Sequence, residues 1–282
     1  MSNLLTLLSN QGRGQPIGGG GGDVPVPVWT PASVPDLVAW WDFSDIDQLF
    51  QDESKSTPVA SDGDVIGACA DKSGQGNDIL QATNGNRPLY KTNRHNSLSA
   101  ALFDDTDDYL DVGNSMTTAT SSTVFTVVAV PGSADSCQVG TADEGGTSRY
   151  LRLNVNQSGN WWYYRQRNAG TTDELRVLHG IGGGAGTAFL NTISSDGSTI
   201  SLRLNGAPKT LAVSSGENGG DWFGDVSNRD NFTVGALLWS GGLNSPYDGD
   251  ICEILVYDSV PSVTDRGLIE AFFATKWGLT LA

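Results

Sequence analysis

The stretch YDGDICEILVYDS, Tyr247 to Ser259, is the most strand-like run in the sequence, and it carries Asp250 and Glu253. Carboxylates at alternate positions of a strand lie on one side of a sheet, which is the arrangement that a retaining glycanase needs. Asp250 and Glu253 are three positions apart, so a regular strand places them on opposite faces. The spacing therefore predicts a structural strand without a catalytic pair, and we expect a protein that is not an enzyme.

Further short strand-like segments precede this one, separated by turn sequences such as SDGD, SGQGND, TNGN and NGAP. With the opening stretch they cover residues 37–44, 100–105, 108–113, 122–130, 149–155, 161–167, 187–194, 199–206, 232–238 and 250–258. Short strands at regular spacing, without intervening helical patterns, are typical of antiparallel sandwiches. The sequence therefore predicts an all-β fold with two antiparallel sheets.

One helix is predicted at the end of the chain. Ser262 is placed as its N-cap, with Asp265 three residues later as a variant of the capping box. Apolar side chains recur at helical spacing from Leu268 to Trp277, and Gly278 stands where a glycine often ends a helix. We expect its apolar face to cover one edge of the sandwich.

The composition excludes several classes of partner. The 282 residues carry 32 acidic and 16 basic side chains, a formal net charge of −16, so we expect neither nucleic acid nor an anionic membrane as partner. No window approaches the roughly 18 uninterrupted apolar residues that cross a membrane. The first residues lack the basic region of a secretory signal. Cys69, Cys137 and Cys252 are odd in number and far apart, so we expect buried thiols in a protein made in a reducing cytoplasm.

Residues 1–30 differ from the remainder. A short apolar patch is followed by a run of five glycines and by alternating valine and proline, which favours an extended arm. We interpret it as an arm that anchors the domain of residues 31–282 to neighbouring proteins. The predicted anchoring side chains are Leu4, Leu5, Leu7, Leu8, Pro16, Ile17, Val24 and Val26.

Several motifs together resemble a known family. LVAWWDFSD, DKSGQGND followed by RP, LSAALFDDTDDYLDVG and GDICEILVYDSVPS, with a closing KWGL, are similar to concanavalin A-like sandwich domains of the laminin-G type. The nearest variety is common in phage virion proteins and in bacterial surface proteins. The match runs from about Pro35 to Leu279. It implies a two-sheet jelly roll that binds glycans or proteins, often with Ca²⁺, or serves as a structural shell, and it suggests Arg87 of the RP motif as partner of Glu253.

Two functions remain open at this point. The preferred hypothesis is a structural virion protein of a tailed phage, attached by its arm to capsid or tail subunits. It would be assembled in the host cytoplasm as a homo-oligomer, with a trimer as the first expectation. The alternative is a Ca²⁺-dependent carbohydrate-binding module of a bacterial surface protein. A host-surface glycan is a candidate ligand under either hypothesis.

Three sets of residues are candidates for binding. Asp104, Asp105, Asp107 and Asp108 crowd four carboxylates into one turn, which favours either a solvated acidic turn or a Ca²⁺ site. In the strand NWWYYRQR, alternation places Trp161 and Tyr163 on one face, as candidates for stacking on a sugar or for contact with a subunit, with Arg165 or Arg167 beside them. Trp222 and Phe223 lie in a glycine-rich loop, where we expect exposed aromatic side chains that contact a partner.

Overall fold

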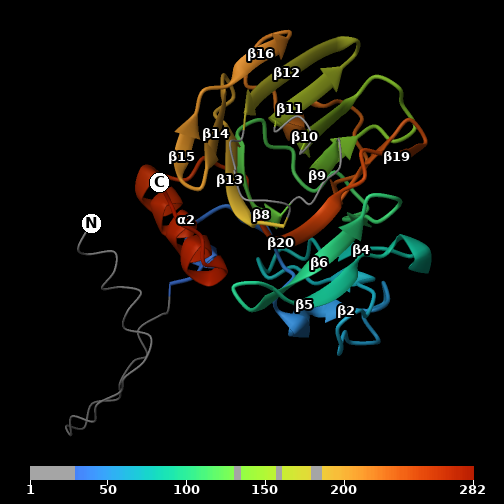
Figure 1. The fold of residues 1–282 in the computed structure, drawn as a ribbon. Helices are drawn as coiled ribbons and strands as arrows, with labels where there is room; N and C mark the ends of the chain where they lie inside the picture. The colour runs from blue at the N-terminus through green and yellow to red at the C-terminus, as the bar shows by residue number, and fades with distance from the viewer. Residues whose placement is uncertain (1–28, 130–134, 157–160, 179–185) are drawn as a thin grey trace, which may run out of the picture.

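The computed structural model describes residues 29–129, 135–156, 161–178 and 186–282, and it is a sandwich of two antiparallel sheets (Figure 1). Within these residues, sheet A has the order β15-β14-β13-β8-β20-β6-β5, and β1 also pairs with β20. Its strands are β1 (Leu37–Asp42), β5 (Leu89–His95), β6 (Leu98–Asp104), β8 (Ser122–Ala129), β13 (Phe189–Ser195), β14 (Ile200–Leu204), β15 (Ala207–Lys209) and β20 (Asp248–Tyr257).

Sheet B has the order β16-β12-β11-β10-β9-β17-β7-β4-β3-β2. Its strands are β2 (Leu49–Phe50), β3 (Ala68–Cys69), β4 (Ile79–Leu80), β7 (Leu110–Asp111), β9 (Ser136–Ala142), β10 (Tyr150–Asn156), β11 (Trp161–Asn168), β12 (Thr171–Leu178), β16 (Ala212–Ser215) and β17 (Thr233–Val234). A separate hairpin pairs β18 (Leu237–Trp239) with β19 (Gly242–Asn244). Short 3₁₀ helices occur at η1 (Pro31–Ser33), η2 (Ile46–Gln48), η3 (Asn84–Asn86) and η4 (Phe223–Asp225).

The all-β prediction is confirmed, and each of the ten predicted segments contains strand residues. Sequence reasoning missed three long strands, β5, β9 and β12. Their sequences, LYKTNRH, SCQVGTA and TTDELRVL, are rich in polar or small residues and lack a clear apolar alternation. The three cysteines are buried and unpaired, as expected.

The predicted helix is also confirmed, as α2 (Val263–Trp277). The Ser262 hydroxyl accepts a hydrogen bond from the Asp265 amide at 3.1 Å, and Gly278 takes the left-handed conformation at φ 67°. Ile269, Phe273 and Trp277 pack in one cluster with the side chains of sheet A that point away from the core, so the helix covers the outer face of this sheet. In the described part of the chain no helix is long and apolar enough to cross a bilayer.

The prediction that Asp250 and Glu253 lie on opposite faces is wrong, because β20 contains a bulge. The register against β8 shifts between Ile251 and Glu253. Ile251 and Ile254 consequently both belong to the core between the sheets, although they are three residues apart. The extra residue places Asp250 and Glu253 on the same outer face of sheet A.

Sharing a face does not make these two acids a catalytic pair, because both are buried and each is held by other partners. Asp250 is 2% exposed and accepts a hydrogen bond from Arg94 Nε at 2.9 Å. His95 Nε2 is hydrogen-bonded to the same carboxylate at 2.8 Å. Glu253 is fully buried and accepts from the indole nitrogens of Trp40 at 2.7 Å and Trp277 at 2.8 Å. Both carboxylates are thus withdrawn from solvent.

The proposed pairing of Glu253 with Arg87 is wrong as well. Arg87 donates to the backbone oxygens of Gln81, Ala82 and Gln51, and so holds together the loops around it. The counter-ion of Glu253 is Lys276 of α2, whose Nζ is 2.8 Å from Glu253 Oε2.

Lys276 also bridges to a second buried acid. Its Nζ is 2.8 Å from Asp42 Oδ2 on β1, and Lys72 Nζ contacts the same oxygen at 2.8 Å. Burial raises the pKa of Glu253, and the nearby Asp42 charge adds to this effect while Lys276 opposes it. Burial also disfavours the charged form of Asp42, yet Lys276 and Lys72 together hold its pKa below the usual value. Lys276 therefore connects β1, β20 and α2, because its ammonium group is the counter-ion of a buried carboxylate on each of the two strands.

Replacing Lys276 with methionine is expected to lower the free energy of unfolding by roughly 3–5 kcal/mol, the usual cost of leaving a buried charge without its partner. Urea denaturation at pH 7 measures this. Adding Glu253→Gln to Lys276→Met should recover part of the loss, because it removes one of the stranded charges.

The matched control is Lys209→Met on the edge strand β15, which removes the same charge from a half-exposed site. Equal losses for the two lysine variants would contradict a structural role for the Lys276 bridge.

Candidate functional site

The three strands β10, β11 and β12 carry the candidate site, and a tight turn sets part of their register. Ala169 at φ 51° and Gly170 at φ 99° join β11 to β12, both in the left-handed region, as a two-residue hairpin turn of the I′ kind requires. In the resulting register Arg165 lies opposite Glu174. Neighbouring residues across an antiparallel pair share a face, so this turn brings an arginine and a glutamate to the same side.

Alternation along β11 separates its aromatic residues between the two faces. Trp162 and Tyr164 are each 1% exposed and belong to the core between the sheets. Trp161 and Tyr163 lie on the opposite, outer face of sheet B, where they line a pocket. The division of these four side chains follows the alternation expected from the sequence.

The pocket has a volume of about 100 Å³. It is formed by side chains of β10, β11 and β12 together with the residue before β9, and it combines aromatic rings with charged and amide groups. The lining residues are Asp135, Asn156, Trp161, Tyr163, Arg165, Glu174 and Arg176. In Figure 1 these strands form the upper part of sheet B, on the far side of the molecule from β2 and β5.

The charges of the pocket are only partly paired. Glu174 is largely buried, and its Oε1 accepts a hydrogen bond from Arg176 Nε at 2.6 Å. Arg165 Nε is 3.5 Å from Glu174 Oε2, a separation at which the ions attract but no hydrogen bond forms in this orientation. Asp135 accepts a hydrogen bond from Asn156 Nδ2 at 3.0 Å at the other side of the pocket.

A fixed arginine stands beside the pocket. Arg152 of β10 lies with its guanidinium carbon 5.8 Å from the ring centre of Tyr150 and 5.6 Å from that of Tyr163. Its Nη1 donates to the hydroxyl of Ser245, which follows β19. The β18–β19 hairpin covers this part of sheet B, and its Trp239 meets Tyr150 at 4.7 Å between ring centres. Two rings and one hydroxyl therefore hold Arg152 in place.

The prediction that Trp222 and Phe223 are exposed is wrong, because both are fully buried. Trp222 lies parallel to Tyr164, and Phe223 packs against Phe232, so both fill the core. Their loop folds inward because it has no Cβ at Gly224, where one would lie 2.3 Å from the oxygen of Thr118. These two aromatic residues are thus not available to a partner.

Sequence reasoning did not find most of the pocket. Of its lining residues, Trp161 and Tyr163 were named as candidates and Arg165 as their neighbour. Asp135, Asn156, Glu174 and Arg176 were not named. The NAG turn before β12 is a hairpin signal that could have indicated a strand there.

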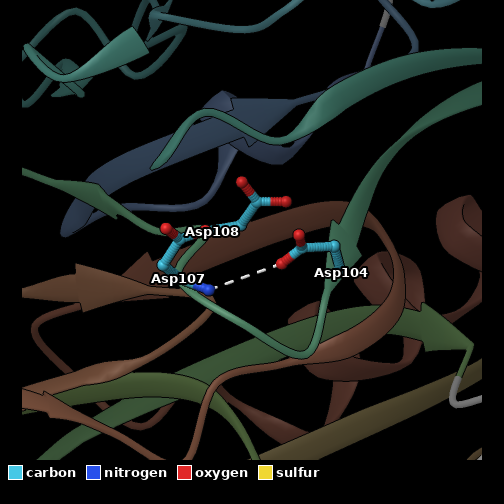
Figure 2. Close-up of side chains that lie close together, drawn as sticks. All are labelled: Asp104, Asp107 and Asp108. Carbon is cyan, nitrogen blue, oxygen red and sulfur yellow. Dashed lines mark hydrogen bonds between the residues drawn. The ribbon is translucent and has the colours of Figure 1, made fainter. Parts of the chain in front are cut away.

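A second cluster consists of acids in the β6–β7 loop (Figure 2). Asp104, Asp107 and Asp108 each offer one carboxylate oxygen, and these atoms lie within 4.8 Å of one another. Asp105 is exposed, lies at φ 63° and does not belong to the cluster. Burial, followed by repulsion from Asp104 and Asp107, raises the pKa of Asp108 to about 7.

Three of the four predicted calcium ligands are therefore close enough to share an ion. Ca²⁺ needs six to eight oxygens, so backbone oxygens or water would have to complete the shell. Acids in the loops that precede β5 accept hydrogen bonds from backbone amides. Asp71, for example, accepts from the Trp40 and Asn77 amides at 2.9 and 3.0 Å. The calcium site stays a prediction.

The eight predicted anchoring residues, Leu4, Leu5, Leu7, Leu8, Pro16, Ile17, Val24 and Val26, lie outside the described residues. Nothing in the structure tests their role.

Comparison with solved structures shows what the fold is similar to. The chain is similar to domain 4 of AbnA, a GH43 extracellular arabinanase from Geobacillus stearothermophilus in complex with arabinotriose, with a TM-score of 0.54 and 13% identity over 83% of this chain and 97% of that chain. It is also similar to the K499G mutant of NanB sialidase from Streptococcus pneumoniae, with a TM-score of 0.50 and 16% identity over 59% of this chain. The match spans 26% of that sialidase.

A third similar structure is the Ruminococcus gnavus IT-sialidase CBM40 bound to alpha2,3 sialyllactose, with a TM-score of 0.45 and 17% identity over 54% of this chain and 82% of that chain. No protein-family model matches the sequence, and no curated protein matches it. The neighbours are β-sandwich domains, which agrees with the predicted fold class, and at these identities the likeness extends to the fold alone.

Replacing Asp108 with asparagine is expected to stabilise the protein at pH 8 and to change little at pH 4. The raised pKa means that the folded state keeps a proton on Asp108 that the unfolded state releases, so wild-type stability falls as the pH rises from about 4 through 7. Asparagine removes this penalty. Free energies of unfolding measured at both pH values test it, with Asp47→Asn at an exposed position as control.

An identical pH dependence in wild type and Asp108→Asn would contradict this assignment. The same variants test the calcium prediction, since Ca²⁺ at pH 8 should raise the Tm of the wild type more than that of Asp108→Asn. A wild-type Tm that Ca²⁺ leaves unchanged would count against an ion at this loop.

Proposed function

We propose that this β-sandwich is a carbohydrate-binding module that holds a saccharide against the outer face of β10, β11 and β12. The observation that carries the proposal is the pocket in which Trp161 and Tyr163 lie beside Arg165, Arg176 and Asn156. The half-buried ring of Trp161 offers a flat apolar surface to a sugar ring, while guanidinium and amide groups hydrogen-bond its oxygens. Tyr163 is 6% exposed and packs against Arg152, so it supports the pocket from beneath. A few polar groups converging beside aromatic side chains are the usual composition of a small-molecule site.

The size of the pocket limits the mode of binding. A volume of about 100 Å³ is below the roughly 300–1,000 Å³ of sites that enclose a small ligand. One edge of a single sugar ring therefore enters the pocket, and neighbouring sugars lie along the open sheet. Such a partly exposed ligand is expected to bind weakly, with a Kd on the order of micromolar to millimolar.

The comparisons support the proposal at the level of the fold. The AbnA domain was solved in complex with arabinotriose, and its likeness covers most of both chains. This supports a module whose ligand is a saccharide, without indicating which saccharide this chain takes.

The interpretation as a virion component stays a prediction. It depends on attachment through residues 1–30, and residues 1–28 lie outside the described part of the chain. The expected trimer, the virion partners and the location on a phage particle are likewise predictions that the described residues do not address.

Replacing Trp161 with alanine is expected to weaken saccharide binding by about tenfold or more, because a lost ring contact costs on the order of 1 kcal/mol beyond the lost area. The measurement is isothermal titration of the full chain with arabinotriose, laminaritriose, sialyllactose and a galacturonic acid trimer.

The matched control is Trp29→Ala, which removes a half-buried tryptophan that packs against Phe272 of α2. Trp29→Ala should bind as the wild type does. Absence of binding to every saccharide, or equal loss in both tryptophan variants, would contradict the proposed function.

A further inference from the structure

The outer face of β10, β11 and β12 carries a charge opposite to that of the protein. The chain has a net charge of −16 and only 16 basic residues. Four of these, all arginines, alternate outward on the three strands: Arg152, Arg165, Arg167 and Arg176. On the same outward positions, as far as the structure describes them, the only acid is Glu174. Basic side chains are thus concentrated on one small surface of an acidic protein.

The acids near the pocket do not neutralise these arginines. Glu174 and Asp135 face three guanidinium groups in or beside the pocket, those of Arg152, Arg165 and Arg176. Three positive and two negative charges leave an excess of one positive charge. Glu174 Oε1 accepts its hydrogen bond from Arg176, whereas Glu174 Oε2 is 3.5 Å from Arg165 Nε. Among the described residues, Arg165 therefore has an acid nearby but no hydrogen bond to it.

The same arginines are reachable from solvent. The side chains of Arg165 and Arg176 are 36% and 44% exposed, whereas Glu174 is 8% exposed. A ligand that approaches the pocket therefore meets guanidinium groups before it meets the carboxylate. A guanidinium presents paired N–H donors whose spacing fits the two oxygens of a carboxylate.

An excess of one charge fits a monovalent anion better than a polyanion. The remainder of the acidic surface repels a long chain of phosphates or sulfates, while a single carboxylate is influenced mainly by groups within the Debye length of about 8–10 Å. The pocket volume of about 100 Å³ admits such a group beside the edge of a ring. Trp161 lies on the same face of β11 as Arg165, two residues from Tyr163, which pairs with Arg176, and it supplies the surface for that ring.

We propose that the pocket selects a saccharide that bears a carboxylate, bound between Arg165 and Arg176 with its sugar ring against Trp161. This inference rests on the proposed function and adds the chemical class of the ligand. Glu174 then acts as a positioning residue, since its Oε1 lies 2.6 Å from both Nε and Nη2 of Arg176 and so fixes that guanidinium, with Nη1 left for the ligand.

The test compares ligands that differ only in charge. The full chain is titrated with galacturonic acid and with its methyl ester, and with sialyllactose and with its methyl ester. At least one acidic saccharide is expected to bind about tenfold or more tightly than its neutral counterpart, a difference of about 1.4 kcal/mol. This preference should shrink when the salt is raised from about 50 to 500 mM, because screening weakens the ion pair.

Variants locate the effect. Arg165→Gln and Arg176→Gln should each abolish the preference for the acidic saccharide while leaving weak binding of the neutral one. The control is Arg266→Gln on α2, which makes the same charge change away from the pocket. Equal binding of acidic and neutral ligands overturns the inference and leaves the proposed function standing. Binding of none overturns both. If Arg266→Gln loses as much of the preference as Arg165→Gln does, the placement of the ligand carboxylate in this pocket is overturned.

Discussion

Lys276 lies between two buried carboxylates, Asp42 on β1 and Glu253 on β20, at 2.8 Å from each. A buried charge is costly unless it is paired, so the end of α2 is fixed above these two strands. The apolar face of α2 then closes over sheet A, burying Phe125 and Leu255 on the side away from the core. Sheet A is therefore packed against sheet B on one face and against α2 on the other (Figure 1). The outer face of sheet B carries the pocket.

The composition of that open face depends on register. The turn at Ala169 and Gly170 places Arg165 opposite Glu174, and a slip of one residue would send every outward side chain of β12 into the core. The β18–β19 hairpin limits the face on one side and holds Arg152 through Ser245. Rings, amides and arginines thus stand on paired strands, where their positions are better fixed than on loops.

Much of the fold could be predicted from the sequence because its signals are local. Ser262 and Gly278 mark the ends of α2, and the alternation in β14 places Leu202 and Leu204 in the core. The exposure of Trp222 was predicted wrongly because its burial depends on a close backbone approach at Gly224, between segments about a hundred residues apart.

The candidate site was harder to predict for the same reason. Trp161 and Tyr163 could be assigned to one face from alternation alone, whereas the arrival of Glu174 and Arg176 beside them depends on strand pairing. The bulge at Glu253 reverses the expected side of this acid, and the sequence gives no sign of it because the four residues that follow, Ile254 to Tyr257, are apolar on both faces.

The claim that the open face of sheet B is the saccharide site is tested most directly by nuclear magnetic resonance of the ¹⁵N-labelled full chain with a galacturonic acid trimer. We expect the side-chain N–H signals of Arg165, Arg176 and Trp161 to shift as ligand is added, while those of the buried Trp41 and Trp222 stay in place. Shifts confined to α2 and the outer face of sheet A, with the pocket signals unchanged, would contradict it.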